Sequence, residues 1–299
     1  MKFRLTSVAA GIAVAALALS ACGNEGSPDS GTGAPGATAP TYTVASGVAV
    51  AGSPTFDKIK NRGELVVGVK FDQPGLGQKP AGADKPVGFD VEIAKMIGAD
   101  LGFAPEKIKF TETVSANREP FIQNGTVDLV VATYTINDAR KQVVDFAGPY
   151  YVAGQDLLVK KDNNDITGPD ALAGKKVCSV DGSTPAKRIK DNYPQAQLIT
   201  FDTYSKCVEQ LSSGSVDAVT TDDAILRGYA AAQKDAFKVV GKPFSKEPYG
   251  IGMPKGDTAL RKFVNDALKK REDSGDWKKA FEFTLGSADG VTPPAIDNY

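Results

Sequence analysis

Apolar runs alternate with polar and glycine-containing segments along most of the chain after residue 54. The run over residues 127–131 consists mostly of β-branched and aliphatic residues, which is typical of a buried parallel strand. Polar residues follow this run, with hydroxyl groups at Thr133 and Thr135. In open α/β sheets, ligands bind beyond the carboxyl ends of the strands. The pattern therefore predicts a ligand crevice where this strand ends.

Further apolar patterns predict the other elements of an α/β fold. Asp90 precedes a helical pattern and is well placed to cap that helix. A later pattern with Trp277, Phe281 and Leu285 predicts a last helix that packs on the first half of the molecule. We expect strands over 65–69, 108–111, 156–159 and 175–180, and helices over 56–61, 91–101 and 258–270.

A weak internal repeat predicts two similar lobes. Residues 122–133 align with residues 211–222 and share glycine, valine, aspartate and valine at the same offsets. Each copy predicts a helix end, a glycine turn and a buried strand with a polar group at its carboxyl end. That group is Thr133 in the first copy and Asp222 in the second. The lobes would then offer complementary chemistry, with cations and hydroxyls on one side and a carboxylate on the other.

The order of these patterns predicts how the chain divides between the lobes. We expect residues 55–153 and 247–299 to form lobe 1 and residues 154–246 to form lobe 2. The strand over 156–159 and the segment over 243–253 would then form a two-strand hinge.

The N-terminal residues predict export and a tether. Lys2 and Arg4 precede an apolar run over 8–19, which is too short to cross a bilayer as a mature helix and is typical of a signal peptide over 1–21. The residues that end at Cys22 resemble a bacterial lipobox, which implies that Cys22 is lipidated; a plain signal peptide is the alternative. Residues 22–54 are rich in Gly, Ala, Ser, Thr and Pro, so we expect a flexible tether.

Composition excludes several classes of function. The 35 basic and 36 acidic residues include no basic block, so we expect no binding to nucleic acid. The absence of histidine removes Ser-His-Asp and Cys-His catalysis and most zinc sites, while catalysis by carboxylates or lysine stays open. We expect neither a metal nor a cofactor.

Several polar residues fall at the predicted crevice. Arg140 can present a bidentate fork to a carboxylate, although a solvated turn is the alternative for its loop. Lys70 follows one strand and Arg118 begins a helix after another, and an exposed lysine is the commoner case at a strand end. Ser183 and Thr184 open a helix in the second lobe, where they favour an anionic group or act as ordinary caps.

Cys178 and Cys207 remain as a pair if Cys22 carries lipid. They lie on a predicted strand and on a helix that should pack against it. In an exported protein this arrangement favours a structural disulfide, and a redox function is the alternative.

Several motifs in fixed order resemble one known family. The segments are GVKFDQPG, GFDVEIAK, the Asn117-Arg118 pair, ATYTINDAR, DFAGPYY, DGST and TTDD, preceded by the lipobox and tether. Together they resemble the bacterial extracellular solute-binding proteins that supply polar amino acids to ABC importers, most of all the glutamate-binding lipoproteins of Gram-positive bacteria. The resemblance implies a two-lobed, type II periplasmic-binding-protein-like fold with a two-strand hinge.

The resemblance also implies roles for the crevice residues. Arg140 would hold the α-carboxylate of a free amino acid and Asp222 would receive its α-ammonium group. Lys70 and Arg118 would meet a side-chain carboxylate, although Lys70 stands where some relatives have arginine. The remaining contacts would come from Thr133 and Thr135 in lobe 1 and from Ser183 and Thr184 in lobe 2.

We therefore expect a binding protein and not an enzyme, for glutamate or aspartate. It would act as a monomer, be held by lipid at the extracellular face of the cell membrane and deliver its ligand to the permease of an ABC importer. Three alternatives stay open. They are a preference for another polar amino acid such as glutamine, a dehydratase on the same fold, and a structural surface lipoprotein without a charged pocket.

Overall fold

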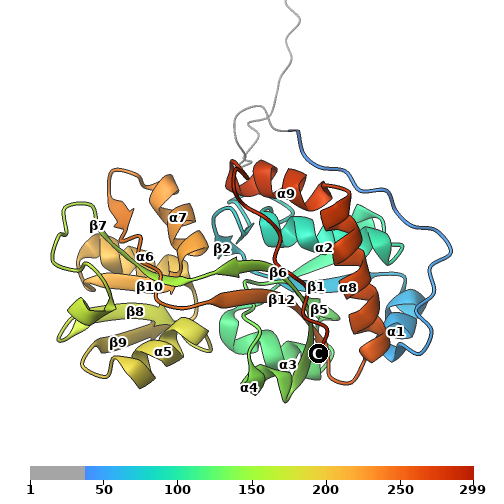
Figure 1. Cartoon of the computed structure of the whole chain (residues 1–299), viewed down its shortest axis with the longest axis horizontal. Helices are drawn as coiled ribbons and strands as arrows, with labels where there is room; N and C mark the ends of the chain where they lie inside the picture. The colour runs from blue at the N-terminus through green and yellow to red at the C-terminus, as the bar shows by residue number, and fades with distance from the viewer. Residues whose placement is uncertain (1–37) are drawn as a thin grey trace, which may run out of the picture. The chain divides into compact units, whose positions relative to one another are not determined.

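The computed structural model describes residues 38–299 (Figure 1). The predicted signal peptide, the lipidation site Cys22 and the first part of the predicted tether lie outside these residues. None of the helices within the described range is both long enough and apolar enough to cross a membrane.

The first five-stranded sheet has the order β4-β1-β5-β12-β6, and we call the part of the chain that carries it lobe 1. Strand β1 is parallel to β4 and β5, whereas β12 is antiparallel to both β5 and β6. The strands are β1 (Leu65–Val69), β4 (Ile108–Glu112), β5 (Leu129–Val130), β6 (Val144–Ala153) and β12 (Glu247–Pro254). The helices are α1 (Pro54–Arg62), α2 (Phe89–Asp100), α3 (Arg118–Gln123), α4 (Asp138–Lys141), α8 (Thr258–Asp273) and α9 (Asp276–Leu285).

The predicted strand over 127–131 is shorter in the structure. Only Leu129 and Val130 pair as β5, although the whole run is buried. The backbone N–H of Val66, on the neighbouring strand β1, donates to Oδ2 of Asp128 at 2.8 Å and not to a backbone carbonyl group of the run. The apolar pattern thus predicted the burial correctly and overestimated the length of the ladder.

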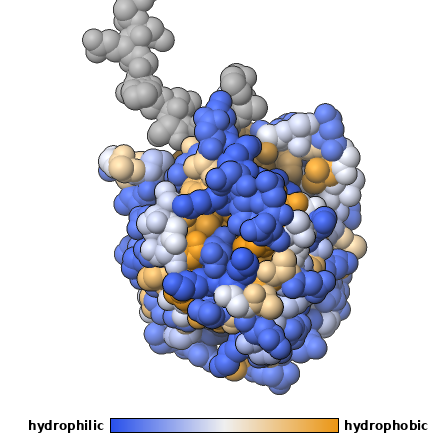
Figure 2. Space-filling model, turned by 90° about the vertical axis from the view of Figure 1, so that its left-hand side faces the viewer, coloured by the Kyte–Doolittle hydropathy of each residue, from blue (hydrophilic) through white to orange (hydrophobic). Residues whose placement is uncertain are grey.

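The second five-stranded sheet has the order β11-β7-β10-β8-β9 and defines lobe 2. Strand β8 is parallel to β9 and β10, and β7 is antiparallel to β10 and β11. The strands are β7 (Gln155–Lys160), β8 (Lys176–Val180), β9 (Gln197–Phe201), β10 (Ala218–Asp222) and β11 (Phe237–Val239). The helices are α5 (Thr184–Asn192), α6 (Tyr204–Ser213) and α7 (Asp223–Ala232). The face over lobe 2 is mostly hydrophilic (Figure 2).

Two adjacent connections join the lobes. Gly154 alone separates β6 from β7, and residues 240–246 lead from β11 back to β12. A Cβ on Gly154 would lie 2.7 Å from Cβ of Pro243 and 2.8 Å from the carbonyl oxygen of Ser245, so the two connections touch (Figure 1). Glycine is required there because any side chain would force the connections apart.

The predicted tether is wrong for residues 38–53, which pack on lobe 1. The hydroxyl of Tyr42 donates to the carboxylate of Glu92 at 2.9 Å, and the N–H of Ala45 donates to the carbonyl of Ala99 at 2.9 Å. Val50 is buried. The average composition of the segment suggested disorder, but these few contacts attach it to α2. At the other end of the chain, the hydroxyl of Tyr299 accepts the N–H of Phe146 at 2.8 Å.

Cys178 on β8 and Cys207 on α6 form a disulfide bond in the structure. The bond closes a loop with a sequence separation of 29 residues. A disulfide that closes a loop of this length restricts the unfolded chain and lowers its conformational entropy.

Reduction of this disulfide should lower the free energy of unfolding by about 3–4 kcal/mol, because the unfolded chain regains its conformational freedom. Urea denaturation with and without a reductant measures the change. A Cys178→Ala/Cys207→Ala variant serves as the control and should be insensitive to reductant. Equal stability of the wild type under both conditions would contradict the expectation.

Candidate functional site

Three cationic side chains are buried in lobe 1 where it faces lobe 2. Lys70 follows β1, Arg118 begins α3 and Arg140 lies in α4, and their exposed fractions are 3%, 2% and 8%. The ammonium group of Lys70 donates to Oγ of Ser115 at 2.8 Å. The three residues lie close to one edge of the sheet, because the parallel strands β1, β4 and β5, which they follow in the chain, all end at that edge.

Arg118 is held by backbone carbonyl groups from both lobes. Its Nη1 donates to Ala132 and Thr133 at 3.2 and 3.1 Å, and its Nη2 donates to Gly182 of lobe 2 at 3.2 Å. Burial, and then the charge of Arg140, lowers the pKa of Arg118 to about 10. Burial, and then the charge of Arg118, lowers the pKa of Lys70 to about 7.

Tyr134 supports both guanidinium groups with its aromatic ring. The Cζ atoms of Arg118 and Arg140 lie 4.5 and 4.9 Å from the ring centroid. The negative face of the ring attracts cations, so it partly offsets the repulsion between the two arginines. No sequence pattern indicated a role for Tyr134, although it stands between Thr133 and Thr135 in the polar segment.

Arg140 connects the two lobes. Its Nε pairs with the carboxylate of Glu119 at 2.9 Å, and its Nη1 donates to the carbonyl of Thr135 at 2.8 Å. Its Nη2 donates to the carbonyl of Gly182 at 2.9 Å, and Nη1 also reaches Oγ1 of Thr184 at 3.3 Å. The guanidinium group thus faces lobe 2, as predicted for a crevice residue, while Glu119 is a partner that the sequence did not indicate.

Thr133 adopts an unusual backbone conformation with a φ of 46°. Its N–H donates to Oδ2 of Asp90 at 2.8 Å, and the hydroxyl of Tyr150 donates to Oδ1 of the same carboxylate at 2.7 Å. Left-handed backbone is costly for a residue other than glycine, so the hydrogen bond to Asp90 helps to hold it. Asp90 thereby fixes the polar segment that leads to Arg140.

The prediction that Asp90 caps its helix is wrong. Helix α2 begins two residues earlier than predicted, at Phe89, and Gly88 occupies the cap position without a side-chain hydrogen bond. A Cβ on Gly88 would lie 2.3 Å from the carbonyl oxygen of Leu76, so only glycine fits. Asp90 is instead fully buried, and burial raises its pKa to about 7.

Lobe 2 contributes a buried carboxylate at the end of β10. Oδ2 of Asp222 accepts the hydroxyl of Tyr249 at 2.7 Å, whereas Oδ1 has no hydrogen-bond partner within residues 38–299. Burial, and then the nearby charge of Glu247, raises the pKa of Asp222 to about 7. A buried oxygen without a partner is costly and is well suited to accept a donor from a ligand.

The two hydroxyl residues of lobe 2 differ in their roles. Ser183 caps α5, because its Oγ accepts the N–H of Ala186 at 3.0 Å, as the alternative interpretation of the sequence had it. Thr184 reaches Arg140 across the lobes. Arg140, Ser183 and Thr184 also line an open pocket of about 590 Å³.

Tyr204 is a further buried residue of this region that the sequence analysis missed. It begins α6 and is 3% exposed. Burial, and then the charge of Asp222, raises its pKa to about 12. The same rule that found Thr133, a polar group following a strand end, applies to Tyr204 after β9.

These features define a class of protein. Two α/β lobes, joined by two crossing segments, enclose charged groups of both signs where strand ends of the two lobes face each other, as in two-lobed solute-binding proteins. The chain belongs to the bacterial extracellular solute-binding proteins, family 3, whose family model matches residues 65–285. The fold is accordingly the type II fold of periplasmic binding proteins, as predicted.

Relatives and solved structures support this assignment. The chain is 44% identical over 234 residues to the glutamate-binding protein GluB of Corynebacterium efficiens, covering 75% of this chain and 79% of that protein. It is 40% identical over 228 residues to the ABC transporter glutamine-binding protein GlnH of Bacillus subtilis, covering 76% and 83%. The structure of an ancestral arginine-binding protein bound to glutamine matches with a TM-score of 0.71 at 38% identity, covering 76% of this chain and 99% of that chain.

Replacement of Asp90 by alanine should lower the free energy of unfolding by about 2–4 kcal/mol, because it leaves two buried donors without an acceptor. Urea denaturation measures this change. Asp84→Ala, which removes an exposed acidic side chain nearby in the sequence, is the control. The role assigned to Asp90 would be refuted if both variants unfolded at the same urea concentration as the wild type.

Proposed function

We propose that the protein binds an acidic amino acid, glutamate or aspartate, between its lobes. The observation that carries this proposal is that two buried cations of the site lack an ion-pair partner. Within residues 38–299, Lys70 and Arg118 have no carboxylate within ion-pair distance, whereas Arg140 pairs with Glu119. An additional anion from a ligand would therefore stabilise the closed site.

Each end of the ligand has a complementary group. A free amino acid needs a cation for its α-carboxylate and an anion for its α-ammonium group. Arg140 serves the α-carboxylate. In the described part of the chain, its Nη atoms donate to neutral oxygens of Thr135, Gly182 and Thr184, which a carboxylate can replace. Asp222 serves the α-ammonium group through its unpartnered Oδ1.

The side chain of the ligand then meets the remaining cations. Lys70 and Arg118 would bind its carboxylate, and the hydroxyl and backbone groups of Thr133 and Thr135 would add hydrogen bonds. Ser183 and Thr184 would complete the site from lobe 2. In this arrangement Glu119 stays on Nε of Arg140 and keeps the two Nη atoms directed at the ligand.

Glutamine is the main competing ligand. Among the relatives, GluB is named for glutamate and GlnH for glutamine, at 44% and 40% identity. The charge favours glutamate. A neutral side chain would leave Lys70 and Arg118 buried without a partner, and loss of one partner from a buried charge pair commonly costs about 2–5 kcal/mol.

We also propose how the protein acts in the cell. A lipid on Cys22 would hold the chain at the extracellular face of the cell membrane, and the protein would act there as a monomer. The closed, ligand-bound protein would then deliver its amino acid to the permease of an ABC importer. Residues 38–53 pack on lobe 1 and would therefore move with it.

A dehydratase is the second candidate function, and one observation favours it. The carboxyl group of Asp222, with a pKa raised to about 7, is partly protonated at neutral pH and is a possible general acid. Incubation with prephenate or arogenate and analysis of the products tests this activity. The relatives described above are named as binding proteins, so we favour binding without catalysis.

Arg118→Ala should weaken glutamate binding by about tenfold to thousands of fold and glutamine binding far less, because only glutamate loses a buried ionic partner. Arg140→Ala should abolish binding of both. Isothermal titration calorimetry measures both ligands. Lys187→Ala, which removes an exposed cation at the edge of the same pocket, is the control and should bind as the wild type does. Equal losses for both ligands in Arg118→Ala would refute the acidic assignment.

The affinity for glutamate should fall by up to about tenfold per pH unit as the pH rises from about 7 to 9, because Lys70 loses its proton and only its charged form attracts a carboxylate. Calorimetry at several pH values measures the slope. Lys70→Arg, which stays charged in this range, should not show this fall, and neither should glutamine with the wild type. A flat profile for glutamate with the wild type would remove Lys70 from the side-chain contact.

A further inference from the structure

A short hairpin of lobe 1 reaches across to lobe 2. It consists of β2 (Asp72–Gln73) and β3 (Gly77–Gln78) and follows Lys70 in the chain. Oδ2 of Asp72 accepts the N–H of Tyr204 at 2.8 Å and that of Ser205 at 3.3 Å. The hydroxyl of Tyr229 in α7 donates to the backbone carbonyl of Asp72.

Helix α6 lacks an N-terminal cap of its own. Thr203 occupies the cap position, but its side chain accepts no hydrogen bond from the helix backbone, and the first turn contains no acidic residue. The hydroxyl of Thr203 instead accepts from Oγ of Ser205 at 3.1 Å. The carboxylate of Asp72, from the other lobe, therefore caps the N-terminus of α6 and faces the positive end of the helix dipole.

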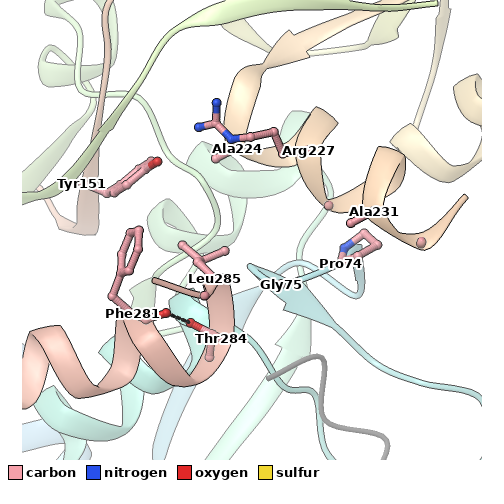
Figure 3. A pocket seen from close by; sticks show the side chains of 12 residues that line it. Pro74, Gly75, Tyr151, Ala224, Arg227, Ala231, Phe281, Thr284 and Leu285 are labelled. Atoms are coloured by element: carbon pink, nitrogen blue, oxygen red, sulfur yellow. Dashed lines mark hydrogen bonds between the residues drawn. The ribbon is translucent and has the colours of Figure 1, made fainter. Parts of the chain in front are cut away.

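Lobe 2 is shaped to receive the hairpin. A Cβ on Gly228 of α7 would lie 2.2 Å from the carbonyl oxygen of Pro74, so the hairpin backbone can approach this helix only at a glycine. Figure 3 shows Pro74 of the hairpin beside Ala231 of the same helix. The contact is thus close and specific, and it exists only while the lobes are together.

The hairpin also connects two groups of the proposed site. A Cβ on Gly77 would lie 2.8 Å from the carbonyl oxygen of Lys70, so β3 packs directly on the Lys70 backbone. On the other side, Asp72 holds the backbone N–H of Tyr204, a buried residue at the start of α6.

We propose that Asp72 is an interlobe clasp, a positioning residue that caps α6 from the opposite lobe and thereby holds the closed conformation with Tyr204 in place. When the lobes separate, the N–H groups of Tyr204 and Ser205 and the carboxylate of Asp72 return to water. Each closure forms these hydrogen bonds again. The clasp acts for any ligand that closes the lobes, so it does not depend on the choice between glutamate and glutamine.

The test compares Asp72→Ala with the wild type. Loss of a cap and its charge corresponds to about 5- to 30-fold faster dissociation of glutamate, with an unchanged association rate, because the clasp forms after the encounter. Stopped-flow fluorescence measures both rates, and small-angle X-ray scattering measures closure as a decrease in the radius of gyration. In Asp72→Ala, saturating glutamate should produce a smaller decrease than in the wild type.

Two further variants separate a clasp from a merely structural role. Asp202→Ala removes an exposed acidic side chain near the same helix end and should leave dissociation and closure unchanged. Thr203→Asp supplies α6 with its own cap, so adding Asp72→Ala to it should have a smaller effect than in the wild type. The melting temperature of ligand-free Asp72→Ala should equal that of the wild type.

The proposal would be overturned if Asp72→Ala released glutamate at the wild-type rate, or if its only effect were a lower melting temperature without ligand. It would also be overturned if Asp202→Ala accelerated dissociation equally. Absence of glutamate binding by the wild type would instead refute the proposed ligand. Glutamine would then replace glutamate in the same assay, and the same rates would test the clasp.

Discussion

The structure depends on how three positive charges are tolerated in its interior. Lys70, Arg118 and Arg140 are all nearly inaccessible to solvent, and burial lowers the pKa of Lys70 and of Arg118. Backbone carbonyl groups, the ring of Tyr134 and the carboxylate of Glu119 offset part of this cost. Within residues 38–299, Lys70 and Arg118 have no ion-pair partner, which is why we propose an acidic ligand.

The same groups couple ligand chemistry to the position of the lobes. Arg118 and Arg140 both donate to the carbonyl oxygen of Gly182, so the cations of lobe 1 already contact lobe 2. Tyr249 of β12, in the sheet of lobe 1, donates to Asp222 of lobe 2. A ligand that binds between these groups gains contacts with both lobes only when they are closed, which is the basis of capture by a two-lobed protein.

Much of the fold could be predicted from the sequence, because each strand and helix has a local cause. The apolar run of β1 matches its predicted range, and the predicted helix over 258–270 lies within α8. Two similar lobes followed from the repeat. Disorder was predicted for residues 38–53 because composition averages over a segment, whereas order there depends on single contacts such as that of Tyr42 with Glu92.

The candidate site could be predicted in part for the same reason. Strand ends identify Thr133, Lys70 and Asp222, since the rule requires only the position of a polar residue after an apolar run. The contacts between residues far apart in the chain could not be predicted from the sequence. Asp72 and Tyr204 are 132 residues apart, and the pairing of Arg140 with Glu119 depends on how α3 and α4 pack.

The measurement that tests the central claim most directly is calorimetric titration of the wild-type protein with glutamate and glutamine at neutral pH. The two ligands have nearly the same shape and differ in one charge. Because that charge would pair with Lys70 and Arg118, we expect glutamate to bind about tenfold to thousands of fold more tightly. Equal affinities, or tighter binding of glutamine, would contradict the account.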